Sequence, residues 1–409
     1  MAALLSVEEA RALLLDGAAP LQGEVIPIAQ ARGRVLAEAV RAKRDQPFYD
    51  ISAMDGYAVA TTVPPGKHRF TTVGTAVAGE AYATALGAGE AVRIFTGGVV
   101  PAGARVVVQE QAERDGDEVT LSLLPGDPSH VRPAGSDYAA GDQLLARGER
   151  LSGARLAILA AADVATVDVR RRPRVVVMSS GDELAPPGEA GDRVVNSGAY
   201  GVAGLIEAWG GEATIAPILP DDLSVCAERF TNLDAAQADL VITIGGASVG
   251  ERDVLRRAAE EADYAVGFAG VAVRPGKPLW SATRRGAPRI LGVPGNPASA
   301  MVGTRLFAVP IVTALLGQSM EDCLATLTAY LTAEASPNGD RETYLRARLS
   351  FDDAGRIAAQ PAPSQDSGLM TPFSAGGALL RRLIGADIAR EGCAIEALPI
   401  EPWPWSLAS

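Results

Sequence analysis

The sequence is poor in the side chains that most often build metal and redox centres. Its 409 residues include two histidines, His68 and His130, and three cysteines, Cys226, Cys323 and Cys393. The cysteines are odd in number, far apart and without a C-x-x-C pair, which argues against a disulfide framework and against a thiolate zinc site. Two isolated histidines likewise argue against a histidine-ligated metal and a Ser-His-Asp triad.

Other absences narrow the class of protein further. No stretch of eighteen apolar residues is free of charge, glycine and proline, so we expect no membrane span. The start of the chain has no signal-peptide pattern and leads into a capping box, Ser6-x-x-Glu9, so we expect a cytoplasmic protein. The net charge of −12 argues against non-specific nucleic-acid binding, which needs a basic surface.

The remaining composition, 48% hydrophobic and 21% charged, is that of an ordinary globular protein with room for several domains. The distribution of helix-like and strand-like sequence patterns along the chain predicts five parts. These are N-terminal helical segments (1–40, with helices at 6–16 and 29–39), a β-rich insert (41–142), a linker region with a helix near 153–162 (143–173), a doubly wound α/β domain (174–323) and a C-terminal β domain (324–409).

Strands and helices alternate in the α/β part, which favours a mostly parallel sheet with helical crossovers. The expected strands are 175–178, 214–218, 240–244 and 290–293, and the expected helices are 201–209, 222–230, 252–259 and 298–316. Pro310 should kink the last helix, because proline cannot donate a backbone hydrogen bond.

Two loops rich in glycine and proline carry the strongest local signal. They span residues 245–253 and 294–299, and each follows an apolar strand pattern and precedes a helical one. Ligands of open α/β sheets bind at the carboxyl ends of strands, where glycines expose backbone N–H groups and helix N-termini attract anions. The pattern predicts a phosphate or other oxyanion site that includes Gly245, Gly246, Ser248, Pro294, Pro297 and Ser299.

Carboxylates and cations cluster at the same predicted edge. Glu183, Asp221 and Asp253 would repel one another there unless a hard cation joined them, and Mg²⁺ bridging a phosphate is the natural occupant. Asp221 and Asp253 are also typical helix N-caps, so both interpretations stay open. Arg274 and Lys277 surround a Pro-Gly turn that could clamp an oxyanion.

Six motifs follow one another along the chain. They are SAMDGYA at 52–58, TG-x-x-x-P at 96–101, SGDEL at 180–184, GG-x-SVG-x-x-D at 245–253, PGKP at 275–278 and PGNP at 294–297. The segments at 52–58 and 96–101, taken alone, are also typical of turns. Taken in order, the motifs resemble the molybdopterin molybdenumtransferase family, which includes MoeA and the gephyrin E domain, and the resemblance covers nearly the whole chain.

The resemblance implies a reaction in molybdenum cofactor biosynthesis. Family members insert molybdenum from molybdate into adenylylated molybdopterin and release AMP, with Mg²⁺. They form homodimers, whose active site lies between the MogA-like α/β domain and the β-rich insert of the partner. A MogA-type protein and recipient molybdoenzymes are further partners that the resemblance implies.

Family roles transfer by position to three sets of residues. The catalytic positions are Asp55, Thr96, Asp137 and Glu183, and the metal positions are Asp221 and Asp253. The substrate-binding positions add Arg132, Ser180, Arg274, Lys277, Ser299 and Ser367 to the residues of the two loops.

The chain departs from the family pattern near the expected pocket. Ile51 stands where asparagine is usual, Ser136 replaces a glutamate, Gly198 replaces the asparagine of an Asp-Ser-Asn segment, and Arg274 replaces a lysine. A non-catalytic molybdopterin-binding or scaffold paralogue therefore stays open as a second interpretation. A nucleotide pyrophosphatase of the same α/β fold is a third, against which the 52–58 motif and the long β insert argue.

Overall fold

A computed structural model of the chain describes residues 4–80, 82, 84–234, 238–245, 254–374 and 377–402. The chain divides into two compact units. The α/β unit comprises Met1–Glu24, Gly33–Ala37 and Val169–Ser409, and the β-rich unit comprises Val25–Arg32 and Glu38–Asp168. Each unit is described by itself below.

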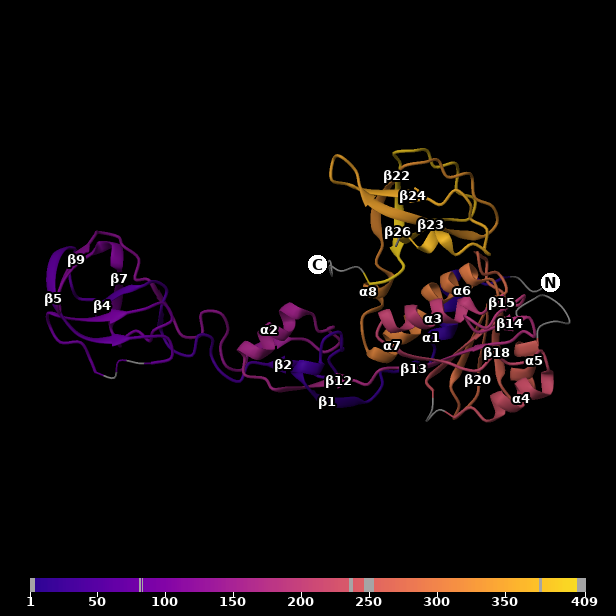
Figure 1. Ribbon diagram of the computed structural model, residues 1–409, viewed down its shortest axis with the longest axis horizontal. Helices are drawn as coiled ribbons and strands as arrows, with labels where there is room; N and C mark the ends of the chain where they lie inside the picture. The colour runs from indigo at the N-terminus through magenta and orange to yellow at the C-terminus, as the bar shows by residue number, and fades with distance from the viewer. Residues whose placement is uncertain are drawn as a thin grey trace. The chain divides into compact units, whose positions relative to one another are not determined.

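The α/β unit contains a six-stranded sheet in the order β16-β13-β17-β21-β20-β18 (Figure 1). β16, β13, β17 and β21 are parallel, and β20 and β18 extend the sheet as antiparallel strands. The bounds are β13 (Arg174–Ser179), β16 (Glu212–Ile215), β17 (Leu240–Ile244), β18 (Ala265–Ala269), β20 (Trp280–Thr283) and β21 (Arg289–Val293). Every residue of β17 is buried, as expected of a central strand covered on both faces.

Helices cover both faces of this sheet. Ile242 packs in a core cluster with α3, α7 and α1, whereas its neighbour Val241 packs with α4 and α5, because successive side chains of a strand point to opposite faces. The helices are α1 (Val7–Leu15), α3 (Ser197–Ala208), α4 (Leu223–Thr231), α5 (Val254–Glu261), α6 (Pro297–Gly303) and α7 (Val309–Leu316).

The segment Pro297–Leu316 is one apolar helix, long enough by composition to cross a membrane, but 89% of its most apolar window is buried inside the protein. It is a core helix. A π-helical turn, Thr304–Ala308, interrupts it and ends two residues before Pro310. Pro310 cannot donate to the carbonyl of Leu306, and Arg11 Nε donates to that oxygen instead, at 3.2 Å.

The C-terminal part forms a second six-stranded sheet, in the order β19-β23-β24-β22-β26-β25, which an additional β23–β25 pairing closes into a small barrel. The bounds are β19 (Val273–Arg274), β22 (Leu327–Leu331), β23 (Glu342–Phe351), β24 (Ile357–Pro361), β25 (Ala378–Arg382) and β26 (Ala394–Pro399). Side chains of the α/β domain hold its last strand: Trp209 Nε1 donates to the carbonyl of Ile400 at 3.0 Å.

The β-rich unit has its own six-stranded sheet, in the order β7-β4-β6-β5-β9-β8, in which only β5 and β6 pair in parallel. The bounds are β4 (Gly56–Ala60), β5 (Gly66–Ala76), β6 (Glu90–Ile94), β7 (Ala104–Val108), β8 (Ala112–Asp115) and β9 (Glu118–Leu123). Two short antiparallel pairs, β3 (Ile51–Ser52) with β10 (Val131–Arg132) and β2 (Val40–Arg41) with β11 (Gln143–Leu145), and helix α2 (Gly153–Ala161) complete it.

The predicted fold class is confirmed, but several elements differ. The expected helix at 29–39 is wrong: a short 3-10 turn (Ile28–Gln30) is followed by Gly33 at φ +76°, and Leu36 then pairs antiparallel with Val169. The strand expected from residue 324 begins at Leu327 instead. Residue 324 is the end of helix α8 (Met320–Leu324), whose N-cap is Ser319. The antiparallel strands β18 and β20 were not predicted.

Candidate functional site

A cavity of about 570 Å³ lies at the carboxyl ends of β13, β17 and β21. The sequence analysis predicted an oxyanion site at these strand ends. Segments around residues 180–198, 221, 244–245, 278 and 294–297 line it. The predicted site residues among them are Ser180, Glu183, Asp221, Gly245, Pro294 and Pro297.

Glycine is what lets these loops meet. Gly245 has φ +98°, and a Cβ atom there would lie 2.9 Å from the carbonyl oxygen of Ser180. A Cβ on Gly295 would lie 3.5 Å from the Cα of Gly245. Since L-residues rarely adopt that φ and real Cβ atoms essentially never come within 3.0 Å of such an atom, Gly245 admits no larger side chain without a shift of the strand end.

Two helix N-termini face this cavity. Asn196, Ser197 and Gly198 line it at the start of α3, and Asn296 and Pro297 line it at the start of α6. Backbone N–H groups at such ends lack helical partners, and the helix dipole adds a partial positive charge. These two helix ends therefore favour an anion in their part of the cavity.

The departure at Gly198 is not a steric requirement. A Cβ there would lie 3.7 Å from the Ile244 side chain and from the Cα of Pro297, which is ordinary van der Waals contact. Nothing in the structure explains why glycine replaces the usual side chain.

Carboxylates crowd the rim of the same cavity. Burial raises the pKa of Asp221, and the negative charges of Glu183 and Asp182 raise it further. The Ser180 hydroxyl is buried and makes no hydrogen bond of good geometry, yet it lies near enough to Asp221 to lower that pKa in part. The surroundings of Asp221 thus disfavour its charged form, and a bound cation would stabilise that form.

The neighbouring aspartate has the alternative role that the sequence left open. Asp222 is the N-cap of α4, and its Oδ1 accepts from the amides of Ser224 at 2.8 Å and Val225 at 3.0 Å. These hydrogen bonds lower the pKa of Asp222. The N-cap of α4 is therefore Asp222 and not Asp221.

Two carboxylates that the sequence placed beside a metal, Glu183 and Asp221, line this rim. Among the described residues no group of three or more His, Cys, Asp and Glu side chains is arranged to hold a metal. Magnesium, however, is usually bound through one or two carboxylates together with substrate phosphates and water. Three predicted site residues, Gly246, Ser248 and Asp253, lie outside the described residues.

The C-terminal domain contacts the start of α6, beside the cavity, through Ser367. Its hydroxyl accepts from Asn296 Nδ2 at 2.8 Å, and its carbonyl accepts from the amide of Ala298 at 3.2 Å. Arg346, 1% exposed, fixes this loop by donating to the carbonyls of Asp366 at 2.8 Å and Leu369 at 2.6 Å. The predictions missed Arg346, whose only signal was a charged residue inside an apolar strand pattern.

Three other predicted residues do not line this cavity. Ser299 is buried within α6, and Lys277 is exposed, although its neighbour Pro278 does line the cavity. Arg274 lines a different cavity, beside the C-terminal strands. Of the predicted Pro-Gly turn segment, only Pro278 therefore lines the cavity at the strand ends.

In the β-rich unit, Asp55 and Thr96 form a close pair. Asp55 Oδ1 accepts from the amide of Thr96 at 2.7 Å and from its hydroxyl at 2.8 Å, and both bonds lower the pKa of Asp55. Gly56 begins β4, where a Cβ would lie 2.0 Å from the carbonyl oxygen of Val107 on the neighbouring strand. At Gly56 the two strands therefore approach too closely for a larger side chain. The neighbouring Asp55 carboxylate is held in place by Thr96.

Arg132 and Asp137 lie on the same unit and are both exposed. Arg132 pairs with Ile51 across the short β3–β10 ladder, and the amide of Asp137 donates to the carbonyl of Gln46 at 2.9 Å. Ser52 exchanges hydrogen bonds with the glycines that follow Thr96. Strand β3 therefore connects the segment of Arg132 to the Asp55–Thr96 pair.

We expect Thr96→Val to raise the pKa of Asp55 toward its ordinary value, because the valine side chain cannot donate to the carboxylate. A folded-state pKa below the ordinary value favours folding above that ordinary value, and the benefit is lost as pH falls through the folded-state pKa. The variant should lose only the part of this stability that the hydroxyl contributes, because the Thr96 amide, the larger cause of the lowered pKa, stays in place. An NMR titration of the Asp55 carboxyl measures the pKa shift. The control is Thr61→Val, which removes a hydroxyl that donates to the carbonyl of Gly103. An unchanged Asp55 titration would contradict the pairing.

Comparison with known proteins agrees with this architecture. The chain matches "MoeA N-terminal region (domain I and II)" over residues 5–162, "Probable molybdopterin binding domain" over 176–314 and "MoeA C-terminal region (domain IV)" over 328–400. It is 34% identical to a molybdopterin molybdenumtransferase of Nostoc sp., over 90% of this chain and 87% of that one. It is 31% identical to that of Haemophilus influenzae, over 90% and 92%.

A solved structure shows the same arrangement of elements. The molybdopterin biosynthesis moea protein from Pyrococcus horikoshii superposes with a TM-score of 0.82, at 28% identity, covering 98% of this chain and all of that one. Sequence, cavity position and fold thus define a multidomain molybdopterin-binding protein. The chain belongs to the MoeA family of molybdopterin molybdenumtransferases.

Proposed function

We infer that this chain is a molybdopterin molybdenumtransferase of molybdenum cofactor biosynthesis, with adenylylated molybdopterin and molybdate as substrates and AMP as a product. The match to molybdenumtransferases over about nine-tenths of the chain carries the proposal. The cavity at the strand ends supports it, because helix N-termini and carboxylates together suit a pyrophosphate with a cation.

In the proposed mechanism the N-termini of α3 and α6 bind the phosphate oxygens of the substrate. Asp221 and Asp253 would hold Mg²⁺, which would supply charge neutralisation at the pyrophosphate, and Glu183 would be a catalytic carboxylate beside them. Ser180 offers a buried hydroxyl toward the same cavity. Ser367, held by Asn296, places the C-terminal loop over the start of α6.

We propose that Asp55 orients the substrate as a hydrogen-bond acceptor. Its lowered pKa keeps it ionised at neutral pH, so it is a poor general acid there. Thr96, Arg132 and Asp137 would complete the part of the site that the β-rich unit supplies. Arg274, Lys277 and Ser299 stay predicted oxyanion contacts.

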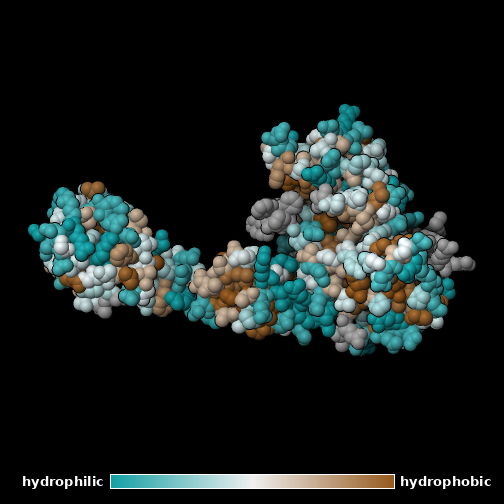
Figure 2. All heavy atoms as spheres, viewed as in Figure 1, coloured by the Kyte–Doolittle hydropathy of each residue, from teal (hydrophilic) through white to brown (hydrophobic). Residues whose placement is uncertain are grey.

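A homodimer is part of this proposal. Helix α2 has one buried residue, Leu159, while Ile158 is 38% exposed, and apolar side chains gather at the surface over α2 (Figure 2). Exposed apolar patches of this kind often mark protein–protein interfaces. We propose a cytoplasmic dimer that hands its product to a molybdoenzyme and receives substrate from a MogA-type protein.

Sedimentation should therefore show a dimer, and a mixing experiment tests whether the site is shared. Asp55→Asn and Asp221→Asn should each be inactive alone. If each site takes residues from both subunits, mixed dimers regain one intact site and the mixture recovers activity. A stable, fully active monomer, or a mixture that stays inactive although mixed dimers form, would contradict the shared site.

Complementation tests the function itself. Expression of the chain in a bacterium that lacks its own molybdenumtransferase should restore molybdoenzyme activity. A scaffold paralogue, the alternative that the departures at Ile51 and Ser136 raise, would bind molybdopterin without restoring activity. The Asp221→Asn variant is the negative control for this strain.

A further inference from the structure

Arg93 is a charged residue in the middle of the sheet of the β-rich unit, and the proposed mechanism does not use it. It lies in β6, directly opposite Tyr57 of β4 and between the buried residues Val92 and Ile94. Its Cζ atom lies 5.1 Å from the centroid of the Tyr57 ring and 4.7 Å from that of the Phe95 ring. Both distances are within the range of cation–π attraction, so two aromatic rings hold the guanidinium against the sheet.

The guanidinium is hydrogen-bonded to the backbone that carries Asp55, once directly and once through a second side chain. Nη1 of Arg93 donates to the carbonyl of Gly56 at 3.0 Å, and Nη2 donates to Oε1 of Gln109 at 2.9 Å. The backbone amide of Gln109 in turn donates to the carbonyl of Asp55 at 3.0 Å. Arg93 therefore holds the backbone of Gly56 directly and supports the residue that holds the backbone of Asp55.

These contacts complement the hydrogen bonds that Thr96 makes to the Asp55 carboxylate. Thr96 holds the end of the side chain, whereas Arg93 and Gln109 hold the two carbonyls that follow the Cα atom of Asp55. A functional side chain keeps one orientation when its supporting residues are themselves fixed by packing and hydrogen bonds. The orientation of Asp55 thus depends on Arg93 as well as on Thr96.

The charge of Arg93 also acts on Asp55. The two oxygens that accept from its terminal nitrogens are neutral, and no carboxylate of the described residues forms an ion pair with it. The hydrogen bonds from Thr96 are the main cause of the lowered pKa of Asp55, and the positive charge of Arg93 lowers that pKa further. A bridge between two neutral oxygens needs donors but no charge, so the cation has a second effect, on the carboxylate.

We propose that Arg93 is a positioning residue of the transferase reaction, which holds the Asp55–Gly56 backbone so that the Asp55 carboxylate meets the substrate in one orientation. The inference rests on the proposed role of Asp55 in orienting the substrate. Arginine suits this task because its planar fork reaches oxygens of two different segments, whereas lysine is a point charge on a flexible chain. Arg93 acts through Asp55 and needs no contact with the substrate itself.

Steady-state kinetics of AMP release by the full chain, with adenylylated molybdopterin and molybdate, test this role. Arg93→Gln should lower kcat and kcat/KM together by about tenfold or more, because a displacement of about 1 Å can cost a hundredfold in rate. Arg93→Lys keeps the charge but not the fork, so it should recover only part of kcat. Arg69→Gln is the matched control and should turn over as the wild type, since Arg69 is exposed on β5 and pairs with Glu118 at 3.0 Å.

An NMR titration of the Asp55 carboxyl gives a second result that does not depend on turnover. The pKa of Asp55 should rise toward its ordinary value in Arg93→Gln and stay lowered in Arg93→Lys and Arg69→Gln. An unchanged titration of Asp55 in Arg93→Gln, or a kcat equal to that of Arg69→Gln, overturns the inference. If the wild type releases no AMP, the proposed function fails, and the titration still decides whether Arg93 acts on Asp55.

Gln109→Leu decides the matter if Arg93→Gln does not fold, because Gln109 is exposed. This change removes the acceptor of Arg93 Nη2 and leaves the backbone amide of residue 109 in place. It should lower kcat by about fivefold, because one charge-assisted hydrogen bond is lost. A folded Gln109→Leu variant with the kcat of the wild type would contradict a positioning role for this contact.

Discussion

Replacing Asp221 by asparagine should lower the rate of AMP release by about a hundredfold or more while the protein stays folded. The change removes a negative ligand, and metal-based charge stabilisation contributes several kcal/mol, where about 1.4 kcal/mol is tenfold. Steady-state kinetics at several Mg²⁺ concentrations measure the loss. The defect should be largest at low Mg²⁺.

The free energy of unfolding of Asp221→Asn should stay the same or rise at neutral pH, although its activity falls. The pKa of Asp221 is raised in the folded protein by burial and by Glu183 and Asp182, so its ionised form opposes folding. That penalty is present above the folded-state pKa and disappears below the ordinary pKa, where both states are protonated. Asp221→Asn should therefore be at least as stable as the wild type at neutral pH, with no gain in acid.

Asp222→Asn is the matched control for this prediction. Asparagine caps helices about as well as aspartate, so this variant should keep both activity and stability. If Asp221→Asn turned over as fast as Asp222→Asn, the carboxylates at the strand ends would have no part in the reaction.

Removal of the buried Arg305 side chain should cause the largest loss of stability. Its Nε donates to the carbonyl of Pro399 at 2.6 Å, and its Nη2 donates to the carbonyl of Cys323 at 2.7 Å. Its Cζ lies 4.5 Å from the centroid of the Trp209 ring. Arg305→Ala leaves two carbonyls unsatisfied and a cavity in the core. We expect a loss of about 3–5 kcal/mol in the free energy of unfolding.

Denaturant unfolding measures this loss, with Arg348→Ala as the control. Arg348 is exposed on β23, and truncation of a surface side chain usually changes stability by less than about 0.5 kcal/mol. Equal midpoints for the two variants would show that Arg305 does not hold β26 and α8 against the core helix.

The sequence predicted the parts of the fold that depend on local pattern. The apolar runs of β13, β17 and β21 have the length and flanking loops of buried strands, and they are the strands whose ends form the cavity. The antiparallel strand β18 was missed because its residues, Ala265–Ala269, alternate weakly and take their strand conformation from pairing with β20.

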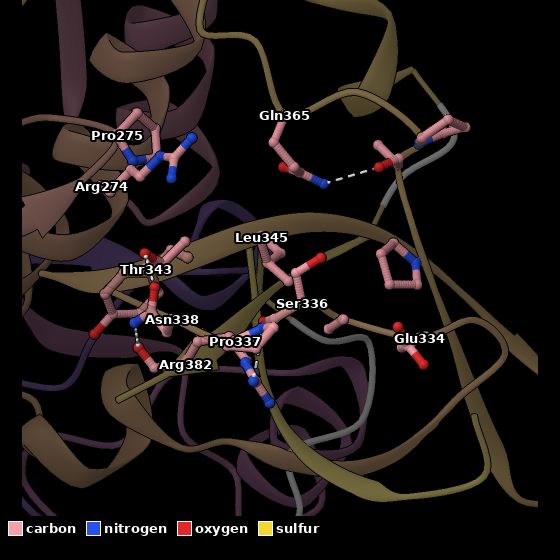
Figure 3. Close-up of a pocket in the computed structure, with 15 residues that line it drawn as sticks. Arg274, Pro275, Glu334, Ser336, Pro337, Asn338, Thr343, Leu345, Gln365 and Arg382 are labelled. Carbon is pink, nitrogen blue, oxygen red and sulfur yellow. Dashed lines mark hydrogen bonds between the residues drawn. The ribbon is translucent and has the colours of Figure 1, made fainter. Parts of the chain in front are cut away.

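The site was predicted only in part, for the same physical reason. Glu183, Asp221 and Gly245 lie in the loops that follow β13, β16 and β17, so the parallel sheet brings them together. The contact of Ser367 with Asn296 joins residues 71 positions apart, and spacing along the chain cannot reveal such a pair. Arg274 and Lys277 are neighbours in sequence, but Arg274 pairs with β23 and lines the cavity beside the C-terminal barrel instead (Figure 3).

AMP release from adenylylated molybdopterin, measured with and without molybdate in the presence of Mg²⁺, tests the central claim most directly. The proposed function predicts rapid release of one equivalent of AMP that depends on molybdate, with molybdenum appearing in the pterin product. The absence of AMP release by a folded protein that still binds adenylylated molybdopterin would contradict it and identify the chain as a binding protein.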